Sequence, residues 1–141
     1  MNKKMQNSTK IENNESVIIN PTQLLFNYLY ATGGKTEYEK LFSDLDEIVI
    51  ALKNEKIKST VVFHGCRVDG NIRGETISNE LWYWISNNFI EHIHRKEKIF
   101  LKFSEKIKPE IQQHINWNLS EKTISILNNV IAKKISNSTL E

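Results

Sequence analysis

Apolar residues recur at helical spacing between positions 38 and 52, and this is the strongest periodic signal in the chain. Steps of three, four and one residue place them on one face of an α-helix. Acidic residues fall mostly on the opposite face, as an amphipathic surface helix requires. Thr36, with Glu39 three residues later, fits a capping box at the start of this helix. The apolar positions are Tyr38, Leu41, Phe42, Leu45, Ile48, Val49 and Leu52.

Three further segments carry helix start or stop signals. Asn20 can cap a helix that Pro21 opens, and Gly33-Gly34 ends it. Pro109 opens a short helix, and Ser120 caps the last one. The residues of these last two helices that we expect to face inward are Ile111, Ile115, Leu119, Ile124, Leu127, Ile131 and Ile135.

The segment from Ser78 to about His94 is predicted to be one more helix. Its buried stripe would contain Leu81, Trp82, Ile85, Phe89 and Ile93, and Tyr83, Trp84 and Ile90 would project away from it. The following residues, 98–107, fit a helix through Ile99, Phe103 and Ile107, and fit a strand through the alternation of Ile99, Leu101 and Phe103. We predict a helix there.

The residue types change after Lys56, and the change indicates a short β segment. Residues 59–63 are β-branched and aromatic, which is typical of a strand. Asp69-Gly70 is a turn signal that could fold Val61–Val68 back against Ile72.

Together these patterns predict a mainly α fold: a single-domain bundle of five to six helices, with a short β-hairpin or strand excursion near residues 59–74. Residues 1–19 are polar and are predicted to be disordered or loosely attached, with the triplet Val17-Ile18-Ile19 pinned to the body. Residues 20–139 would then form the single helical domain. A chain of 141 residues is long enough to bury one core of this kind.

Composition narrows the functional classes. A single cysteine, Cys66, excludes an internal disulfide framework and fits a reducing compartment. There is no apolar run of membrane-spanning length and no secretory signal, so the expected location is the cytoplasm. Lys outnumbers Arg by 16 to 3, which indicates an AT-rich bacterial, phage or plasmid gene. No phosphate-binding, dinucleotide-binding or metalloprotease motif is present, so we expect no cofactor.

Charge is segregated although the net charge is only +2. Six acids lie between residues 37 and 55, among them Asp44, Asp46 and Glu47, which we place on an exposed helical face. Six bases lie between residues 95 and 108, among them Arg95, Lys96, Lys98, Lys102 and Lys106. The bases are interleaved with Phe100 and Phe103, which resembles a surface that tracks phosphates and stacks on nucleotides, although both phenylalanines also fit a core stripe.

The loop from His64 to Glu75 is the first place to look for chemistry, because it combines His64, Cys66 and Arg67 with several glycines. A cysteine nucleophile would need a base within hydrogen-bond reach, and on a strand His64 and Cys66 would lie about 7 Å apart. A metal site is not predicted. On the helix predicted from Ser78 to about His94, the side chains of His92 and His94 would diverge by about 200° and could not share an ion.

Three functional hypotheses remain. The first is a non-enzymatic protein-binding module, such as an inhibitor, immunity or antitoxin protein that neutralises a partner. The second is a small nucleic-acid-binding regulator using the bases of 95–108, and the third is a small enzyme centred on His64, Cys66 and Arg67. Self-association into a homodimer is a further option. The candidate partner-binding residues are Tyr83, Trp84, Arg67, Arg73, Asp44, Asp46 and Glu47.

Overall fold

The protein is a mixed α/β structure, so the predicted mainly helical bundle is wrong. The computed structural model describes residues 17–32, 36–61, 63–66 and 71–139. The helices in these ranges are α2 (Pro21–Ala31), α3 (Tyr38–Asn54), α4 (Glu75–Ser86), α5 (Ile111–Ile115) and α6 (Glu121–Thr139). The strands are β1 (Val17–Ile19), β2 (Thr36–Glu37), β3 (Ile57–Ser59), β4 (His64–Cys66), β5 (Asn71–Arg73), β6 (Ile90–Arg95) and β7 (Lys98–Phe103).

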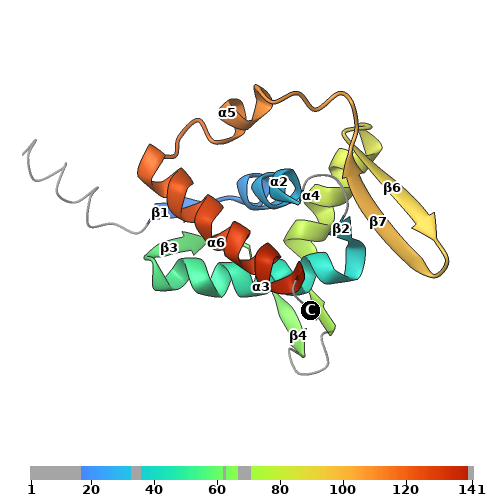
Figure 1. The fold of residues 1–141 in the computed structure, drawn as a ribbon, viewed down its shortest axis with the longest axis horizontal. Helices are drawn as coiled ribbons and strands as arrows, with labels where there is room; N and C mark the ends of the chain where they lie inside the picture. The colour runs from blue at the N-terminus through green and yellow to red at the C-terminus, as the bar shows by residue number, and fades with distance from the viewer. Residues whose placement is uncertain (1–16, 33–35, 62, 67–70, 140–141) are drawn as a thin grey trace, which may run out of the picture.

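The strands form three small sheets among the described residues. β1 pairs with β3 in parallel, β4 pairs with β5 as an antiparallel hairpin, and β2, β7 and β6 form an antiparallel sheet in that order. The β4–β5 hairpin lies where the sequence indicated one, although its turn lies outside the described residues. Figure 1 shows the β6–β7 hairpin extending from one end of the helical body.

Helix α2 occupies the centre of the molecule. It contacts α3, α4, α5, α6 and β7, and Figure 1 shows it enclosed by the other helices. Every residue from Gln23 to Leu29 is buried, so the helix is enclosed on its whole circumference. Its start was predicted correctly: Asn20 and Gln23 form a capping box ahead of Pro21.

The buried amides of α2 hydrogen-bond to residues about 90 positions later. Asn27 and Asn116 exchange hydrogen bonds of 2.9 and 3.1 Å between their side-chain amides. The Gln23 amide donates to the carbonyl of Ile115 and to the side chain of Asn118. Because a buried amide without a partner is costly, this network fixes α5 and the turn that follows it against α2.

The helix predicted from Ser78 to about His94 ends about eight residues early. Asn88 has a left-handed backbone with φ of 63°, its N–H donates to Ile85, and the N–H of Phe89 donates to Trp84. These two bonds form a Schellman motif that closes α4 at Ser86. Asparagine tolerates the left-handed region better than most residues, and the chain leaves the helix there to enter β6.

Residues 98–103 form a strand, so the predicted helix over 98–107 is wrong. The alternation of Ile99, Leu101 and Phe103 is the pattern that the structure follows. Leu101 is buried, and the ring of Phe103 stacks on Phe26 of the central helix at 5.1 Å between centroids. Pairing with β6 satisfies the backbone of this segment along six residue pairs, from Ile90–Phe103 to Arg95–Lys98.

The capping box predicted at Thr36 is also absent. Thr36 pairs with Leu101 in the sheet, α3 begins two residues later at Tyr38, and no side chain caps it. By contrast, Ser120 caps α6 through a hydrogen bond from the N–H of Thr123, as predicted.

No helix in the described part of the chain has the length and apolarity to cross a membrane.

Lys56 offers a test of the α3 terminus. This residue follows the end of α3 with φ of 64°, a conformation that a β-carbon disfavours and glycine adopts readily. We expect Lys56→Gly to raise the free energy of unfolding by about 1 kcal/mol. Urea denaturation followed by circular dichroism measures this change.

Asn88→Gly is the matched control. Asn88 has the same left-handed backbone conformation as Lys56, but asparagine adopts this conformation more readily than lysine does. The effect of Asn88→Gly should be smaller. A lower urea midpoint for Lys56→Gly than for the unsubstituted chain would contradict the expectation.

Candidate functional site

Helix α4 presents two large aromatic side chains to solvent. Ile77, Leu81 and Trp84 form its buried face, at spacings of four and three residues. Trp82 and Tyr83 therefore point outward, and their exposed fractions are 47% and 63%. The sequence had indicated the reverse for the two tryptophans: Trp82 was expected in the core, and Trp84, a candidate partner-binding residue, is 6% exposed and belongs to the core.

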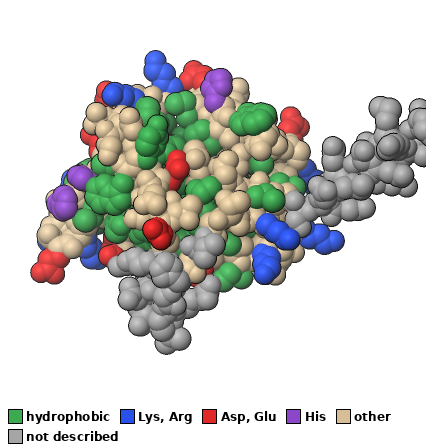
Figure 2. Space-filling view, turned by 180° about the vertical axis from the view of Figure 1, so that it is seen from behind, with side chains coloured by type: hydrophobic (Ala, Val, Ile, Leu, Met, Phe, Trp, Pro, Cys, Tyr) green, Lys and Arg blue, Asp and Glu red, His purple; other side chains and the backbone are tan. Residues whose placement is uncertain are grey.

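Two histidines extend this aromatic surface along β6. His92 and His94 lie on the same face of the strand, with ring centroids 5.4 Å apart, and the His92 ring lies 5.9 Å from that of Trp82. The predicted divergence of the two imidazoles is wrong because residues two apart share a face of a strand. Figure 2 shows histidine side chains beside a large hydrophobic one at an edge of the molecule.

An apolar pocket of about 400 Å³ lies next to Tyr83. Its apolar lining comes from three parts of the chain: α4, the start of the β6–β7 region, and the segment around α5. Figure 2 shows hydrophobic side chains spread over one face of the molecule, with acidic side chains among them. The apolar lining residues are Tyr83, Trp84, Phe89, Ile107, Ile111 and Ile115.

Polar groups in this pocket are few. They are Thr22, Glu80 and His114. Glu80 Oε2 accepts two hydrogen bonds, at 2.6 Å from the indole Nε1–H of Trp84 and at 2.8 Å from the hydroxyl of Thr22. These bonds link α4 to the first turn of α2 and fix the Glu80 carboxylate at the pocket.

The predicted acidic docking residues divide between core and surface. Asp44 and Asp46 are each only 3% exposed, so their placement on an exposed helical face is wrong, whereas Glu47 is exposed. Asp44 accepts a hydrogen bond of 2.6 Å from the hydroxyl of Tyr28. Lys40 and Lys134 lie 3.4 and 3.9 Å from its carboxylate, so Asp44 joins α2, α3 and α6 inside the protein.

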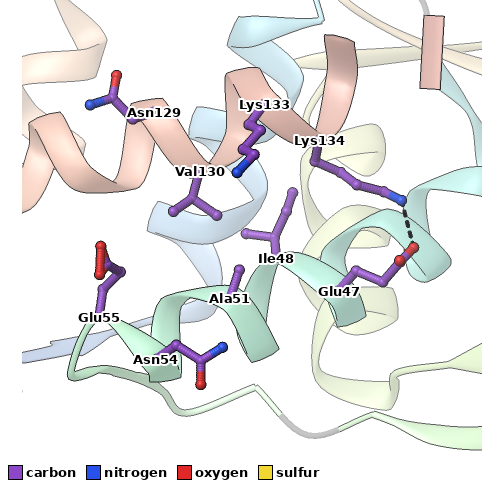
Figure 3. A pocket seen from close by; sticks show the side chains of 9 residues that line it. All are labelled: Glu47, Ile48, Ala51, Asn54, Glu55, Asn129, Val130, Lys133 and Lys134. Carbon is purple, nitrogen blue, oxygen red and sulfur yellow. Dashed lines mark hydrogen bonds and ion pairs between the residues drawn. The ribbon is translucent and has the colours of Figure 1, made fainter. Parts of the chain in front are cut away.

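A second pocket, of about 490 Å³, lies between α3 and α6. Figure 3 shows residues of both helices lining it, with the Glu47–Lys134 ion pair at one end and Glu55 at the other. That ion pair is 2.6 Å long. Two acids from the α3 side and two lysines from α6 line this groove, so its formal charges balance within the chain.

The predicted basic residues lie on and after the β6–β7 hairpin. Arg95 and Lys98 flank its turn, and Lys96 is in the turn with φ of 58°. Lys98 lies 3.7 Å from Glu37, and Lys102 faces Glu91 across the strand pair. Lys106 is exposed in the segment beyond β7. Neighbouring acids therefore offset part of this positive charge.

The candidate catalytic side chains of the His64–Glu75 loop are not among those that the structure describes. His64 and Cys66 lie in β4 and Arg73 in β5, but their side chains lie outside the described part of the structure, as does the whole of Arg67. Among the residues that are described, no group of three or more His, Cys, Asp or Glu side chains could hold a metal ion.

Sequence reasoning missed Glu80 as a site residue, together with Thr22 and His114. The spacing of Glu80 and Trp84 is one usable signal, because residues four apart are neighbours on a helix. Thr22 lies 58 positions from Glu80, so no local pattern could have joined them.

No protein-family model, curated protein or solved structure matches the chain.

Tyr28 provides a test of the buried Asp44 cluster. Burial, and then the adjacent Asp44 carboxylate, raise the pKa of Tyr28 above its ordinary value of about 10. In the unfolded chain the phenol loses its proton near pH 10, whereas the folded protein keeps it. This contribution is fully present below about pH 10, and stability then falls by up to about 1.4 kcal/mol per pH unit as the pH rises further.

Tyr28→Phe should remove this component, so its stability should decline less steeply between about pH 10 and 11.5 in urea denaturation. At neutral pH the variant should be less stable by about 1.5–3 kcal/mol, because a hydrogen bond to a charged group is lost. Tyr83→Phe, which removes an exposed hydroxyl, should follow the unsubstituted chain. Identical pH slopes for all three proteins would contradict the assignment.

Proposed function

We propose that this chain is a non-enzymatic protein-binding module that acts by occupying a partner protein, as inhibitors, immunity proteins and antitoxins do. The observation that carries the proposal is the exposed pair Trp82 and Tyr83, of which Tyr83 lines an apolar pocket. Large exposed aromatic side chains cost solubility, and Trp and Tyr are enriched among the residues that dominate binding energy at protein interfaces.

The rigidity of the surface supports the same function. Trp82 and Tyr83 project from a helix whose opposite face is in the core, and Trp82 contacts His92. Anchors held by secondary structure lose little conformational entropy on binding. The groove between α3 and α6 is a weaker candidate, because its acids and lysines can pair with each other.

The aromatic pair gives the direct test of partner binding. Tagged protein is used to capture partners from lysate of the cells that carry the gene, and the captured protein is identified and purified. We expect the double variant Trp82→Ala/Tyr83→Ala to bind that protein at least about 30-fold more weakly, since truncating interface anchors costs about 2 kcal/mol or more.

Ile50→Ala is the matched control. It removes an exposed apolar side chain from α3, and 44% of Ile50 is exposed. Binding should be unchanged by this substitution. If the aromatic double variant keeps the affinity of the unsubstituted protein, Trp82 and Tyr83 are not the contact surface and the proposal loses its support.

Nucleic-acid binding is the second candidate, favoured by the position of Arg95, Lys96 and Lys98 at the tip of the hairpin. If it operates, Lys98→Glu/Lys102→Glu/Lys106→Glu should weaken binding of a labelled single-stranded oligonucleotide by at least about tenfold at low salt, because phosphate contacts dominate such affinity. Fluorescence anisotropy measures it, with Lys53→Glu/Lys58→Glu as a charge-reversal control elsewhere. Equal loss in both variants would indicate only non-specific attraction.

A further inference from the structure

We infer that the pocket beside Tyr83 binds the side chain of a lysine on the partner protein. This inference rests on the proposed function and names the group that its surface recognises. The pocket offers apolar walls of Tyr83, Trp84 and Phe89 together with the carboxylate of Glu80. A lysine side chain has the matching chemistry, a four-carbon apolar stem that ends in a positive charge.

The carboxylate of Glu80 has one oxygen available to a ligand. Both of its hydrogen bonds within the chain are accepted by Oε2. None of the described residues donates to Oε1 or forms an ion pair with this carboxylate. Among those same residues, no buried side-chain oxygen or nitrogen lacks a hydrogen-bond partner. Oε1 is therefore open to solvent, where an incoming donor can reach it.

This geometry favours lysine over arginine. A guanidinium group binds a carboxylate best through two parallel hydrogen bonds, one to each oxygen. Oε2 already accepts from an indole and a hydroxyl, so only one oxygen is accessible. An ammonium group acts as a point charge and needs only that one oxygen, while its stem packs on the apolar walls.

The shape of the pocket agrees with this occupant. Its volume of about 400 Å³ is at the low end of the range for sites that take small molecules, so one long side chain has room to enter. Aromatic residues supply much of the lining, and their rings attract cations. Tyr83 belongs both to the pocket and to the exposed aromatic pair, so a partner that contacts Trp82 and Tyr83 would place a side chain here without a second interface.

The test uses small probes and no partner protein. The probe is Nα-acetyl-lysine N-methylamide, which has no charge except that of its side chain. The uncharged control is the norleucine derivative, whose side chain has the same four carbons without the ammonium group. Binding is followed in nitrogen-edited NMR spectra through the indole N–H resonance of Trp84. We expect the lysine derivative to shift this resonance saturably and to bind at least about tenfold more tightly than the norleucine or arginine derivative.

Glu80→Gln is the decisive variant. The glutamine carbonyl oxygen can still accept from Trp84 and Thr22, so the fold should be preserved while the charge is lost. We expect this variant to bind the lysine derivative about tenfold more weakly or worse. Glu75→Gln is the matched control, because it removes an exposed acid from the same helix outside the pocket lining, and its binding should be unchanged.

Three results would overturn the inference. The norleucine derivative could bind as tightly as the lysine derivative, Glu80→Gln could leave lysine binding unchanged, or n-butylammonium could bind more tightly than the lysine derivative, which would indicate a free amine as the ligand. The first comparison uses the unsubstituted protein and so does not depend on any variant folding. Failure of the proposed function is distinguishable, because partner capture that depends on Trp82 and Tyr83 is measured separately from probe binding.

Discussion

The polar side chains of α2 set the constraint on which the rest of the fold depends. This helix is buried on all sides, yet it contains Gln23, Asn27 and Tyr28. Each must find a hydrogen-bond partner inside the protein, because an unpaired buried amide or hydroxyl costs about 1–3 kcal/mol. Asn116 and its neighbours satisfy the amides, and Asp44 satisfies the hydroxyl. The central helix therefore fixes α3 on one side and the α5 segment on the other.

The pocket follows from that same network. Its walls include residues of α4 and of the α5 segment, which do not adjoin in sequence. The paired amides hold the α5 segment against α2, and the Glu80–Thr22 bond holds α4 against α2. The recess beside Tyr83 is thus a space between two elements that are each attached to the central helix. A site of this origin is preformed, which lowers the entropic cost of filling it.

Sequence patterns correctly predicted the features that depend on residues a few positions apart in the chain. The start of α2 at Asn20, the cap at Ser120 and the apolar stripe from Leu41 to Leu52 all involve residues a few positions apart. The predictions failed where a distant partner decided the outcome. Residues 98–103 satisfy two periodicities, and only pairing with β6 selects the strand. Trp84 and Asp44 are buried by elements far along the chain. The Asn87-Asn88 pair was the one local signal that could have ended α4 at the right place.

The fold does not require the negative charge of Glu80. Its two hydrogen bonds position Trp84 and join α4 to α2, but a neutral glutamine carbonyl could accept both of them. The walls around this carboxylate are mainly apolar, and none of the described residues forms an ion pair with it. Asp44 shows the contrasting arrangement, with Tyr28, Lys40 and Lys134 gathered around it. A fixed negative charge whose second oxygen reaches solvent is suited to a cation that comes from outside the chain.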